Sequence, residues 1–278
     1  MSGADVVAVV LSWNDADRVI ALLDRLAVLQ PSPDHVVVVD NGSTDGSADR
    51  IARAFPNHEN VRLDANLGFA TAANRGIERA LARGAAWVWL LNTDIVLPVT
   101  ALASLRTAAE ADIRCAMAGA TLTGIDGRVQ ARGGGRVNLW TGSCSHVVSP
   151  GEACDYLSAA CLLVRVAMLR DAGLFDENYF FYWEDVDLAF RARAAGWKLA
   201  VAEDCHVVHM EGSSLGRWSE LRWYYLFRGL GRFLRGRARL PRIAVVIRLL
   251  VHNATMLRHG RVAAVRGAWR AVAGASAR

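Results

Sequence analysis

The stretch VVVVDNGSTDGS, residues Val36 to Ser47, joins a run of valines to a polar loop that contains glycine. A run of β-branched residues predicts a buried strand. A glycine-containing loop directly after a strand often binds phosphate, but this loop begins with the carboxylate of Asp40, which has the wrong charge for phosphate. The sequence therefore predicts a buried strand that delivers Asp40 to a binding site for some other group.

Strands and helices alternate on both sides of this stretch. Expected strands cover residues 6–14, 35–40, 60–64 and 86–94, and expected helices cover residues 16–29, 47–55 and 70–84. The apolar runs of the strands are continuous rather than alternating, which favours a parallel sheet that is buried on both faces. We therefore predict an α/β fold with a mostly parallel central sheet and helices on both faces.

Ligands of such sheets bind beyond the carboxyl ends of the strands. Polar clusters fall at those positions in this sequence: Trp13-Asn14 after the first strand, Asp40-Asn41 after the second, and Asn92-Thr93-Asp94 after the fourth. Residues of a ligand site are therefore expected at this edge of the sheet.

The chain becomes less regular beyond residue 121. Residues 121–149 form a glycine-rich insert in which we expect β structure, with Gly133–Gly135 as a turn. No helix is expected directly after these glycines, so they do not predict a phosphate cradle. A helix is predicted over residues 184–196 and a strand over residues 199–208.

Composition limits the class of protein. The chain has 278 residues, which suits one large domain or one domain with an appendage, and 53% of them are hydrophobic, enough for a sizeable core. The longest apolar runs have the length of a strand, so no membrane span is expected. The five cysteines lack C-x-x-C spacing, which predicts reduced thiols rather than disulfides or a zinc site.

Charge is divided unevenly along the chain. Residues 217–278 contain 14 arginines and one acid, a net charge of +13, whereas residues 1–216 have a net charge of −8. We therefore predict an α/β domain over residues 1–216 and a basic, amphipathic, helical region over residues 217–278. A basic region of this kind favours a polyanionic partner, either a membrane or a nucleic acid.

The start of the basic region has helical periodicity, with apolar residues on one side and arginines on the other. The apolar set is Trp223, Leu226, Phe227, Leu230, Phe233 and Leu234, and the basic set is Arg217, Arg228, Arg232 and Arg235. Such a helix can lie in a membrane interface with its arginines toward the lipid headgroups. It can also pack its apolar side on the rest of the protein, with the arginines in solvent.

Asp94 is a candidate metal ligand. An acid at the end of a buried strand, beside Asn92 and Thr93, can coordinate a divalent cation together with diphosphate oxygens. Asp and Asn are also common in an ordinary strand-end turn. The residues alone leave the two interpretations equal.

Glu184, Asp185 and Asp187 crowd the start of a predicted helix. Capping and the helix dipole account for one or two of these acids. The aromatic residues directly before them, residues 179–183, provide apolar surroundings that raise the pKa of a carboxyl group. A raised pKa suits a general base.

His206 and His209 lie near the end of the last predicted strand. Side chains three positions apart on a strand point to opposite faces, so at most one of the two reaches the site. His209 is nearer to the polar segment that follows, and it is the better candidate.

Trp13 and Asp40 together suit a pyrimidine base. A carboxylate can accept the N–H of the ring, and an indole can stack on its face. Taken singly, Asp40 is also typical of an Asx-turn and Trp13 of a core aromatic residue.

The order of the motifs resembles that of the family 2 glycosyltransferases of the GT-A fold, and most of all their bacterial rhamnosyltransferase-type branch. The matching series is SWN, VVVVDNGSTDGS, NLGFATAANRG, WLLNTDIVLP, AACLLVRVAMLRDAGLFDENYFFYWEDVDLAFRARAAGWK and VVHMEGSS. It extends from about Val6 to Ser214. The resemblance implies a nucleotide-diphosphate sugar donor, Mg²⁺ or Mn²⁺ as cofactor, and inverting transfer in a single displacement.

The resemblance also implies roles for residues of the nucleotide pocket. Trp13 stacks on the base and Asp40 reads it, while Asn66 and Asn74 line the pocket. Asn92 and Thr93 belong to the nucleotide-sugar contacts as well.

The resemblance further implies the metal ligands and the base. The position of the family's DxD motif reads Asn92-Thr93-Asp94 here, so Asp94 carries most of the metal binding. His209 is an implied metal or diphosphate contact. Asp185 is the implied general base.

The expected function is thus inverting transfer of a sugar, with rhamnose as a candidate, from a UDP- or dTDP-sugar to a hydroxyl of a glycan or a polyprenyl-diphosphate-linked acceptor. Such acceptors are frequent in the resembling branch, which favours a cytoplasmic protein bound peripherally, through the basic region, to an anionic membrane surface at the inner face of the cell membrane.

Two rival functions remain at this point. A sugar-phosphate nucleotidyltransferase would carry a glycine-rich basic loop after the first strand, where this chain reads SWNDADRV. A non-enzymatic, polyanion-binding protein built on the basic region is disfavoured by the acidic remainder and by the lack of a recognition motif, so no nucleic acid is expected as partner.

Overall fold

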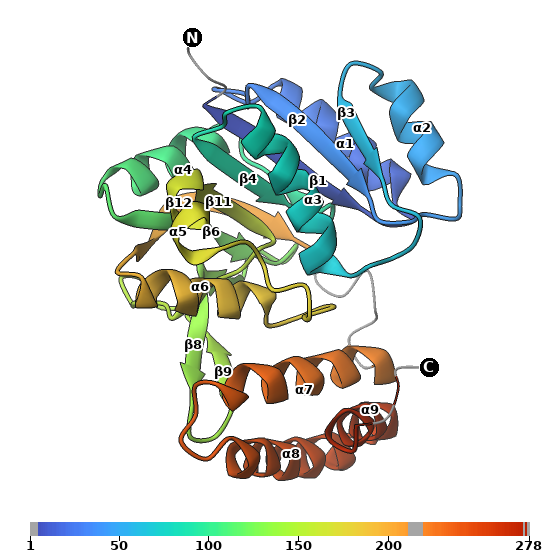
Figure 1. The fold of residues 1–278 in the computed structure, drawn as a ribbon, viewed down its shortest axis with the longest axis vertical. Coiled ribbons are helices and arrows are strands. Elements are labelled where there is room, and N and C mark those ends of the chain that lie inside the picture. The colour runs from blue at the N-terminus through green and yellow to red at the C-terminus, as the bar shows by residue number, and fades with distance from the viewer. Residues whose placement is uncertain (1–4, 211–218, 275, 277–278) are drawn as a thin grey trace.

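The computed structural model describes residues 5–210, 219–274 and 276. Its centre is a nine-stranded sheet whose main path runs β3-β2-β1-β4-β11-β6-β12-β5, with β7 paired to β6. Figure 1 shows this sheet with helices on both faces and a group of three helices below it. The predicted α/β fold is confirmed.

The first half of the sheet is parallel. Its strands are β1 (Val6–Ser12), β2 (His35–Asp40), β3 (Glu59–Arg62) and β4 (Trp87–Leu91), and the connecting helices are α1 (Ala16–Ala27), α2 (Ser47–Ala54) and α3 (Phe69–Ala82). Parallel pairing places Ser12 opposite Asp40. The carboxyl ends of β1 and β2 therefore meet at one edge of the sheet.

The second half of the sheet mixes strand directions. It contains β5 (Ile95–Val96), α4 (Ala101–Glu110), β6 (Cys115–Thr123), β7 (Val129–Arg132), β11 (Cys161–Arg165), α5 (Val166–Ala172), α6 (Glu184–Ala194) and β12 (Lys198–His209). Strand β11 is antiparallel to both neighbours, β4 and β6. The sheet is therefore mixed rather than mostly parallel. The sequence did not reveal this because β11 is buried on both faces and has the continuous apolar run of a parallel strand.

Two apolar layers cover the sheet. Alternate residues of β1 point into opposite layers, so Val7 and Val9 pack with α3, α5 and α6, while Val6, Ala8 and Val10 pack with α1, α2 and α4. This alternation follows from the two-residue period of a strand. The structure contains all five cysteines as free thiols, three of them buried.

A smaller three-stranded sheet is built from β8 (Gly134–Asn138), β9 (Ser143–His146) and β10 (Tyr156–Leu157). The turn predicted at Gly133–Gly135 is wrong, because Gly134 and Gly135 belong to β8. A Cβ at Gly134 would lie 2.1 Å from the carbonyl oxygen of Tyr156. Close approach of two backbones, rather than a turn, therefore explains the glycines.

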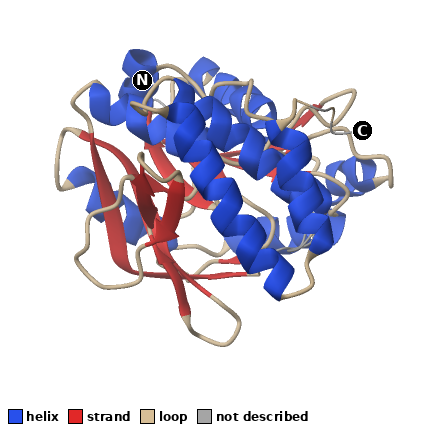
Figure 2. Cartoon of the chain, turned by 90° about the horizontal axis from the view of Figure 1, so that it is seen from below, coloured by secondary structure: helices blue, strands red, loops and turns tan. Residues whose placement is uncertain are grey.

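The basic region is helical, as predicted, and forms α7 (Glu220–Arg235), α8 (Pro241–Arg258) and α9 (Val262–Val272). Figure 1 places α7 against the α/β domain and the other two helices beyond it, and Figure 2 shows the same group from below. The ring of Phe233 lies edge-on to Phe190 at 4.9 Å and tilted against Trp183 at 5.1 Å. The apolar side of α7 therefore packs on the α/β domain, which is the second of the two alternatives for this stretch.

Some predicted features lie outside the described residues. They are Arg217, the junction between residues 216 and 217, and the EGSS end of the last motif. In the part of the chain that the structure describes, no helix combines the length and apolar character needed to cross a membrane.

Candidate active site

Hydrogen bonds join the ends of β1, β2 and β4 into one surface. The backbone N–H of Asn41 donates to the carbonyl of Ser12 at 2.8 Å. The hydroxyl of Thr93, which follows β4, donates to Asp15 at 2.7 Å. Asp15 was not singled out in the sequence, because an acid at the start of α1 looks like an ordinary cap. The predicted clusters at these strand ends are therefore neighbours.

Asp40 has one carboxylate oxygen engaged and one open. Its Oδ1 accepts the N–H of Ser43 at 2.9 Å, as in an Asx-turn. Its Oδ2 is buried and has no hydrogen-bond partner among the described residues, and the residue is only 5% exposed. A buried polar atom without a partner is costly, and such atoms concentrate where a ligand completes the bonding. Trp13, one residue after β1, is 40% exposed and is not a core residue.

The loop that carries Asn66 is held by Asn41, a residue to which the sequence gave no role of its own. The amide of Asn41 donates to Asn66 Oδ1 at 3.1 Å and to the Gly68 carbonyl at 3.2 Å, and it accepts the N–H of Leu67 at 2.9 Å. Gly68 has φ +87°, and a Cβ there would lie 2.3 Å from the carbonyl oxygen of Phe180. This loop therefore rests directly on the aromatic segment before α6.

Asn74 has a different place from the one predicted. It is 3% exposed, and its amide donates to the Phe175 carbonyl at 2.9 Å and to Glu177 at 3.0 Å. Its oxygen accepts the N–H of Phe175 at 3.0 Å. These bonds anchor the segment before α6 to α3, so the contacts of Asn74 do not support a place in the nucleotide pocket.

His209 and Asp94 face each other at the ends of β12 and β4. His209 Nε2 lies 3.7 Å from Asp94 Oδ1, and both side chains are largely buried. His206 is exposed on the same strand. Of the two histidines, His209 is therefore the one beside the strand-end acid.

Gln130 fixes the tautomer of His209. Its amide nitrogen donates to the His209 carbonyl at 3.1 Å, so its oxygen is the atom that faces His209 Nδ1, also at 3.1 Å. An oxygen acceptor requires the proton to be on Nδ1. In the neutral ring the lone pair is then on Nε2, the atom that points toward Asp94. The sequence gave no signal for Gln130, because it lies in the irregular insert.

Asp94 and His209 are donors of the kinds that Mg²⁺ and Mn²⁺ accept. Carboxylate oxygen suits both cations, whereas imidazole nitrogen is a softer donor that fits Mn²⁺ better than Mg²⁺. Mg²⁺ is commonly held by one or two carboxylates together with substrate phosphates. Over residues 5–210, 219–274 and 276, no cluster of three or more His, Cys, Asp or Glu side chains could hold a metal by itself. The pair fits a metal shared with a diphosphate.

The acids at the start of α6 have separate environments. Asp185 Oδ2 accepts the N–H of Ala159 at 3.3 Å and Oδ1 that of Val186 at 2.8 Å, and burial raises the pKa of this carboxyl above its usual range. Glu184 is 6% exposed. Its burial, and then the charge of Asp185, raise the pKa of Glu184 well above its usual range. Both carboxyl groups therefore hold a proton more readily than free acids, and the two backbone hydrogen bonds favour the charged form of Asp185.

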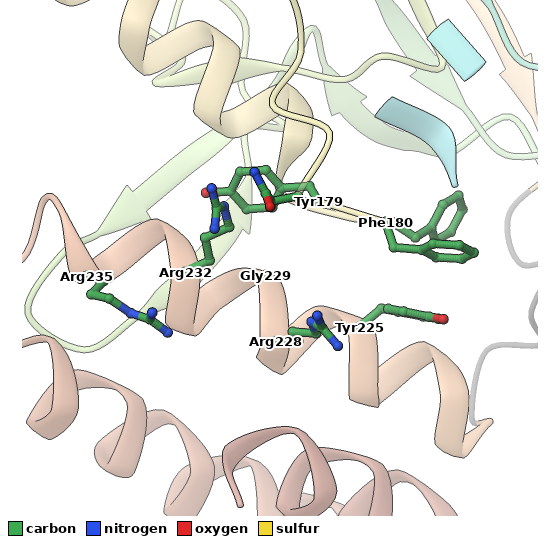
Figure 3. A pocket seen from close by; sticks show the side chains of 9 residues that line it. Tyr179, Phe180, Tyr225, Arg228, Gly229, Arg232 and Arg235 are labelled. Carbon is green, nitrogen blue, oxygen red and sulfur yellow. The ribbon is translucent and has the colours of Figure 1, made fainter. Parts of the chain in front are cut away.

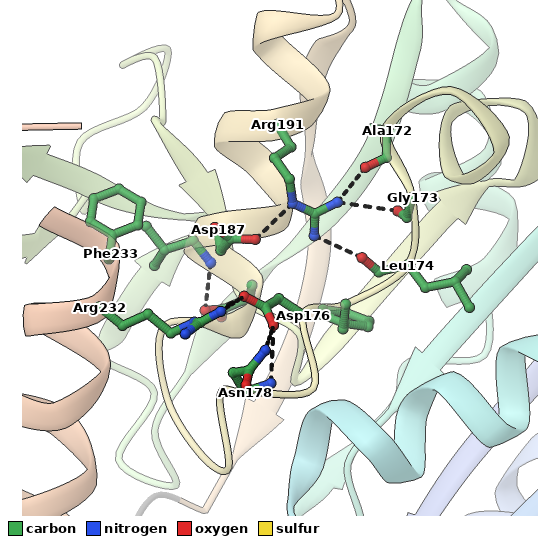
Figure 4. A network of polar contacts seen from close by, with 12 residues as sticks. Ala172, Gly173, Leu174, Asp176, Asn178, Asp187, Arg191, Arg232 and Phe233 are labelled. Carbon is green, nitrogen blue, oxygen red and sulfur yellow. Dashed lines mark hydrogen bonds and ion pairs between the residues drawn. The ribbon is translucent and has the colours of Figure 1, made fainter. Parts of the chain in front are cut away.

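Asp187 is a structural residue. It accepts hydrogen bonds from Arg191 and from Arg237, each at 2.7 Å. Figure 4 shows that the guanidinium of Arg191 also reaches the carbonyls of Ala172, Gly173 and Leu174. Both oxygens of Asp187 are thus committed to arginines.

A short segment connects Asp185 to the strand-end cluster. Ala159 donates to Asp185, and the carbonyl of the next residue, Ala160, accepts the N–H of Asn92 at 3.0 Å. Asp185 and the Asn92–Asp94 segment are therefore attached to consecutive residues of one chain segment. The geometry brings together a buried acceptor at Asp40, a carboxylate–imidazole pair, and a carboxyl of raised pKa.

A doubly covered α/β sheet with such groups beyond its strand ends is the arrangement expected of a glycosyltransferase that uses a nucleotide-sugar donor. The chain belongs to the family described as Glycosyltransferase like family 2, whose sequence profile matches residues 4–225. It is 32% identical over 241 residues to the N-acetylglucosaminyl-diphospho-decaprenol L-rhamnosyltransferase of Mycobacterium tuberculosis, which covers 77% of this chain and 78% of that relative. Membership of this family argues against the two rival functions, a sugar-phosphate nucleotidyltransferase and a non-enzymatic polyanion-binding protein.

Solved structures share the fold. GalNAc-T7 with UDP, GalNAc and Mn²⁺ superposes with a TM-score of 0.64 at 14% identity, over 82% of this chain and 48% of that chain. The mannosyltransferase PcManGT from Pyrobaculum calidifontis, in complex with GDP-Man and Mn²⁺, has a TM-score of 0.62 at 19% identity, over 97% of this chain and 74% of that chain. At these identities the likeness establishes the GT-A fold alone.

Proposed function

We propose that the protein is a metal-dependent, inverting glycosyltransferase that moves a sugar, with rhamnose as the first candidate, from a UDP- or dTDP-sugar to a hydroxyl of a polyprenyl-diphosphate-linked acceptor. The relative that is 32% identical is named for transfer of L-rhamnose to such an acceptor. The observation that carries the proposal is the connected arrangement of Asp40, the Asp94–His209 pair and Asp185 beyond the ends of neighbouring strands.

Asp40 and Trp13 bind the base in this proposal. The buried Oδ2 of Asp40 accepts the ring N–H of a pyrimidine, while the exposed indole of Trp13 stacks on the ring. Support comes from the lack of a protein partner for that oxygen among the described residues and from the exposure of Trp13. Asn66, Asn92 and Thr93 complete the contacts to the nucleotide sugar.

Asp94 and His209 hold Mg²⁺ or Mn²⁺ in this proposal. A cation bound there neutralises the charge of the departing diphosphate. Gln130 keeps the proton of His209 on Nδ1, so that Nε2 is available as a ligand.

Asp185 is the proposed general base. It accepts the proton of the acceptor hydroxyl as that hydroxyl attacks the anomeric carbon from the face opposite the diphosphate. Burial raises the pKa of Asp185, which makes its carboxylate a stronger base than that of a free aspartate. A single displacement inverts the configuration and needs no second carboxylate as nucleophile.

Peripheral binding to an anionic membrane is also part of the proposal, but through α8 rather than α7. Several apolar residues of α8 are about half exposed: Ile243, Val246, Leu250, Val251 and Leu257. Ile247 is somewhat less exposed. Most recur at helical spacing, and exposed arginines, Arg242 and Arg258, lie near the two ends of the helix. This combination suits a helix that lies in a membrane interface.

A donor-binding experiment tests the nucleotide assignment. UDP, dTDP and GDP would be titrated, each with Mg²⁺ or Mn²⁺, into the wild type and into Asp40→Ala. We expect pyrimidine nucleotides to bind more tightly, and Asp40→Ala to weaken their binding by about 1 to 3 kcal/mol, because a buried hydrogen bond is lost. Equal affinity of the wild type for purine and pyrimidine diphosphates would contradict the assignment.

A further inference from the structure

A positively charged pocket of about 210 Å³ lies between α7 and the aromatic segment that leads to α6. Figure 3 shows its two walls, with Tyr179 and Phe180 on one side and a row of α7 side chains on the other. Arginines 228, 232 and 235 line it, and among the described lining residues none is acidic. The pocket is therefore suited to an anion.

The walls of the pocket are firmly built. The rings of Phe180 and Tyr225 stack at 4.6 Å. Arg232 holds Asp176 with two hydrogen bonds of 2.9 and 2.7 Å, and its guanidinium lies 5.4 Å from the centre of the Tyr179 ring. These contacts hold α7 against segment 178–181, and the ion pair with Asp176 neutralises the charge of Arg232.

Two of the arginines are available to bind an anionic ligand. Arg228 and Arg235 are exposed, and no carboxylate of the described residues forms an ion pair with either. Arg228 is oriented by a hydrogen bond of 2.8 Å to the hydroxyl of Tyr224. The two lie seven residues apart on α7, so they share one face of the helix. Two guanidinium groups on one face match a doubly charged anion such as a diphosphate.

The pocket is close to the proposed base. Phe181, which lines the pocket, is separated from Asp185 by four residue steps, which span at most ~14 Å even when extended. In a lipid-linked acceptor the sugar that is attacked is attached directly to the diphosphate. The short chain distance between this wall of the pocket and Asp185 is compatible with one acceptor that places its hydroxyl at Asp185 and its diphosphate in the pocket.

We propose that this pocket binds the diphosphate of the polyprenyl-diphosphate-linked acceptor, with Arg228 and Arg235 as its ligands. This inference rests on the proposed function. It makes α7 an acceptor-binding element that selects acceptors carrying a diphosphate over free glycans.

Steady-state kinetics test the inference with soluble acceptors in the absence of membranes. One acceptor is N-acetylglucosamine diphosphate on a short prenyl chain, and the other is the same sugar on a short alkyl chain without diphosphate. The variant is R228Q/R235Q. The control is R53Q/R170Q, which removes two exposed arginines of the α/β domain.

For R228Q/R235Q we expect KM for the diphosphate acceptor to rise about tenfold to hundredfold. This is the loss of affinity expected when hydrogen bonds to charged groups are removed. We expect kcat, KM for the donor, and both constants for the alkyl acceptor to remain at the values of the control. An unchanged KM for the diphosphate acceptor, or an equal rise for both acceptors, overturns the inference.

A binding experiment separates this inference from the proposed function. Inorganic pyrophosphate and glycerol phosphate are titrated, with a chelator present, into the wild type and R228Q/R235Q. We expect pyrophosphate to bind the wild type, to bind the double variant at least about tenfold more weakly, and to be preferred over glycerol phosphate. Absent or unchanged pyrophosphate binding overturns the inference, and a preference for glycerol phosphate assigns the pocket to phospholipid headgroups instead.

Discussion

Three carboxyl groups within one turn of α6 acquire three different roles from their surroundings. Asp187 gives both oxygens to arginines. Glu184 is buried without a partner for its Oε2 among the described residues. Asp185 accepts two backbone hydrogen bonds and stays half-buried. Spacing alone could show that these acids are crowded, but only the packing of the loops around them distinguishes the proposed base, Asp185, from the anchor, Asp187.

Substitution of each acid in turn separates these roles. We expect Asp185→Asn to lower kcat by about 10² to 10⁴, because general-base assistance is lost, with donor affinity unchanged. We expect Glu184→Gln to retain most activity, because burial raises the pKa of Glu184 and an amide has the same shape as its neutral form. Asp187→Asn lowers the free energy of unfolding by about 2 to 5 kcal/mol, because two arginines lose their charged partner.

The check combines turnover, donor titration and thermal unfolding for the three variants. Because the pKa of Asp185 is raised, activity should increase as the pH rises through a value above the usual range of an aspartate. Asp185→Asn should remove this acidic limb. Wild-type turnover by Asp185→Asn, with a dead Glu184→Gln or Asp187→Asn, would move the base to another acid.

The Asp94–His209 pair leads to a second prediction at the scale of residues. Asp94→Ala should abolish most Mn²⁺-dependent UDP or dTDP binding, because the carboxylate ligand is lost. Gln130→Leu should weaken it about 10- to 100-fold, because His209 loses the acceptor that fixes its tautomer. Calorimetry with and without Mn²⁺ provides the measurement, with His206→Ala as the control. Metal-dependent binding that is unchanged in Asp94→Ala would remove this residue from the site.

At the scale of elements, periodicity predicted the positions of strands and helices, which depend on local sequence. It did not predict strand direction or side-chain partners, which depend on residues distant in the sequence. The strands and helices from Val6 to Leu91 appear close to their expected bounds, because buried strands and amphipathic helices have distinct periods. The direction of β11, and the bonds of Asn74, are set by partners far away in sequence. The strand-end positions of Asp40 and Asp94 could be predicted because strand ends are visible in the sequence, whereas no local signal places Gln130 beside His209.

Helix α8 provides the prediction at this scale. We expect Ile243→Ser, Ile247→Ser and Leu250→Ser together to weaken binding to vesicles that contain phosphatidylglycerol by about tenfold or more, because three partly exposed apolar side chains no longer enter the lipid. Flotation at low salt measures the effect. The control replaces Ile113, Ile125 and Val148, which are exposed on the α/β domain. Equal flotation of both triple variants, or none by the wild type, would contradict membrane docking through α8.

At the scale of the whole molecule, α7 links the proposed site to the basic region. Arg232 holds Asp176, Arg237 holds Asp187, and Phe233 packs between Trp183 and Phe190. All these partners on the α/β domain lie within α6 or the segment before it. Figure 1 shows α8 and α9 on the side of α7 that faces away from the sheet. Helix α7, which carries the arginine pocket, therefore lies between α8 and α6, the helix that carries Asp185.

The anomeric configuration of the product tests the central claim most directly. The purified full chain would be incubated with UDP- or dTDP-sugar, Mg²⁺ or Mn²⁺, and the soluble N-acetylglucosamine diphosphate acceptor, and the new glycosidic bond would be analysed by NMR. With Asp185 as the only base in a single displacement, we predict a product whose anomeric configuration is inverted relative to the donor. A product that retains the configuration of the donor would contradict the account.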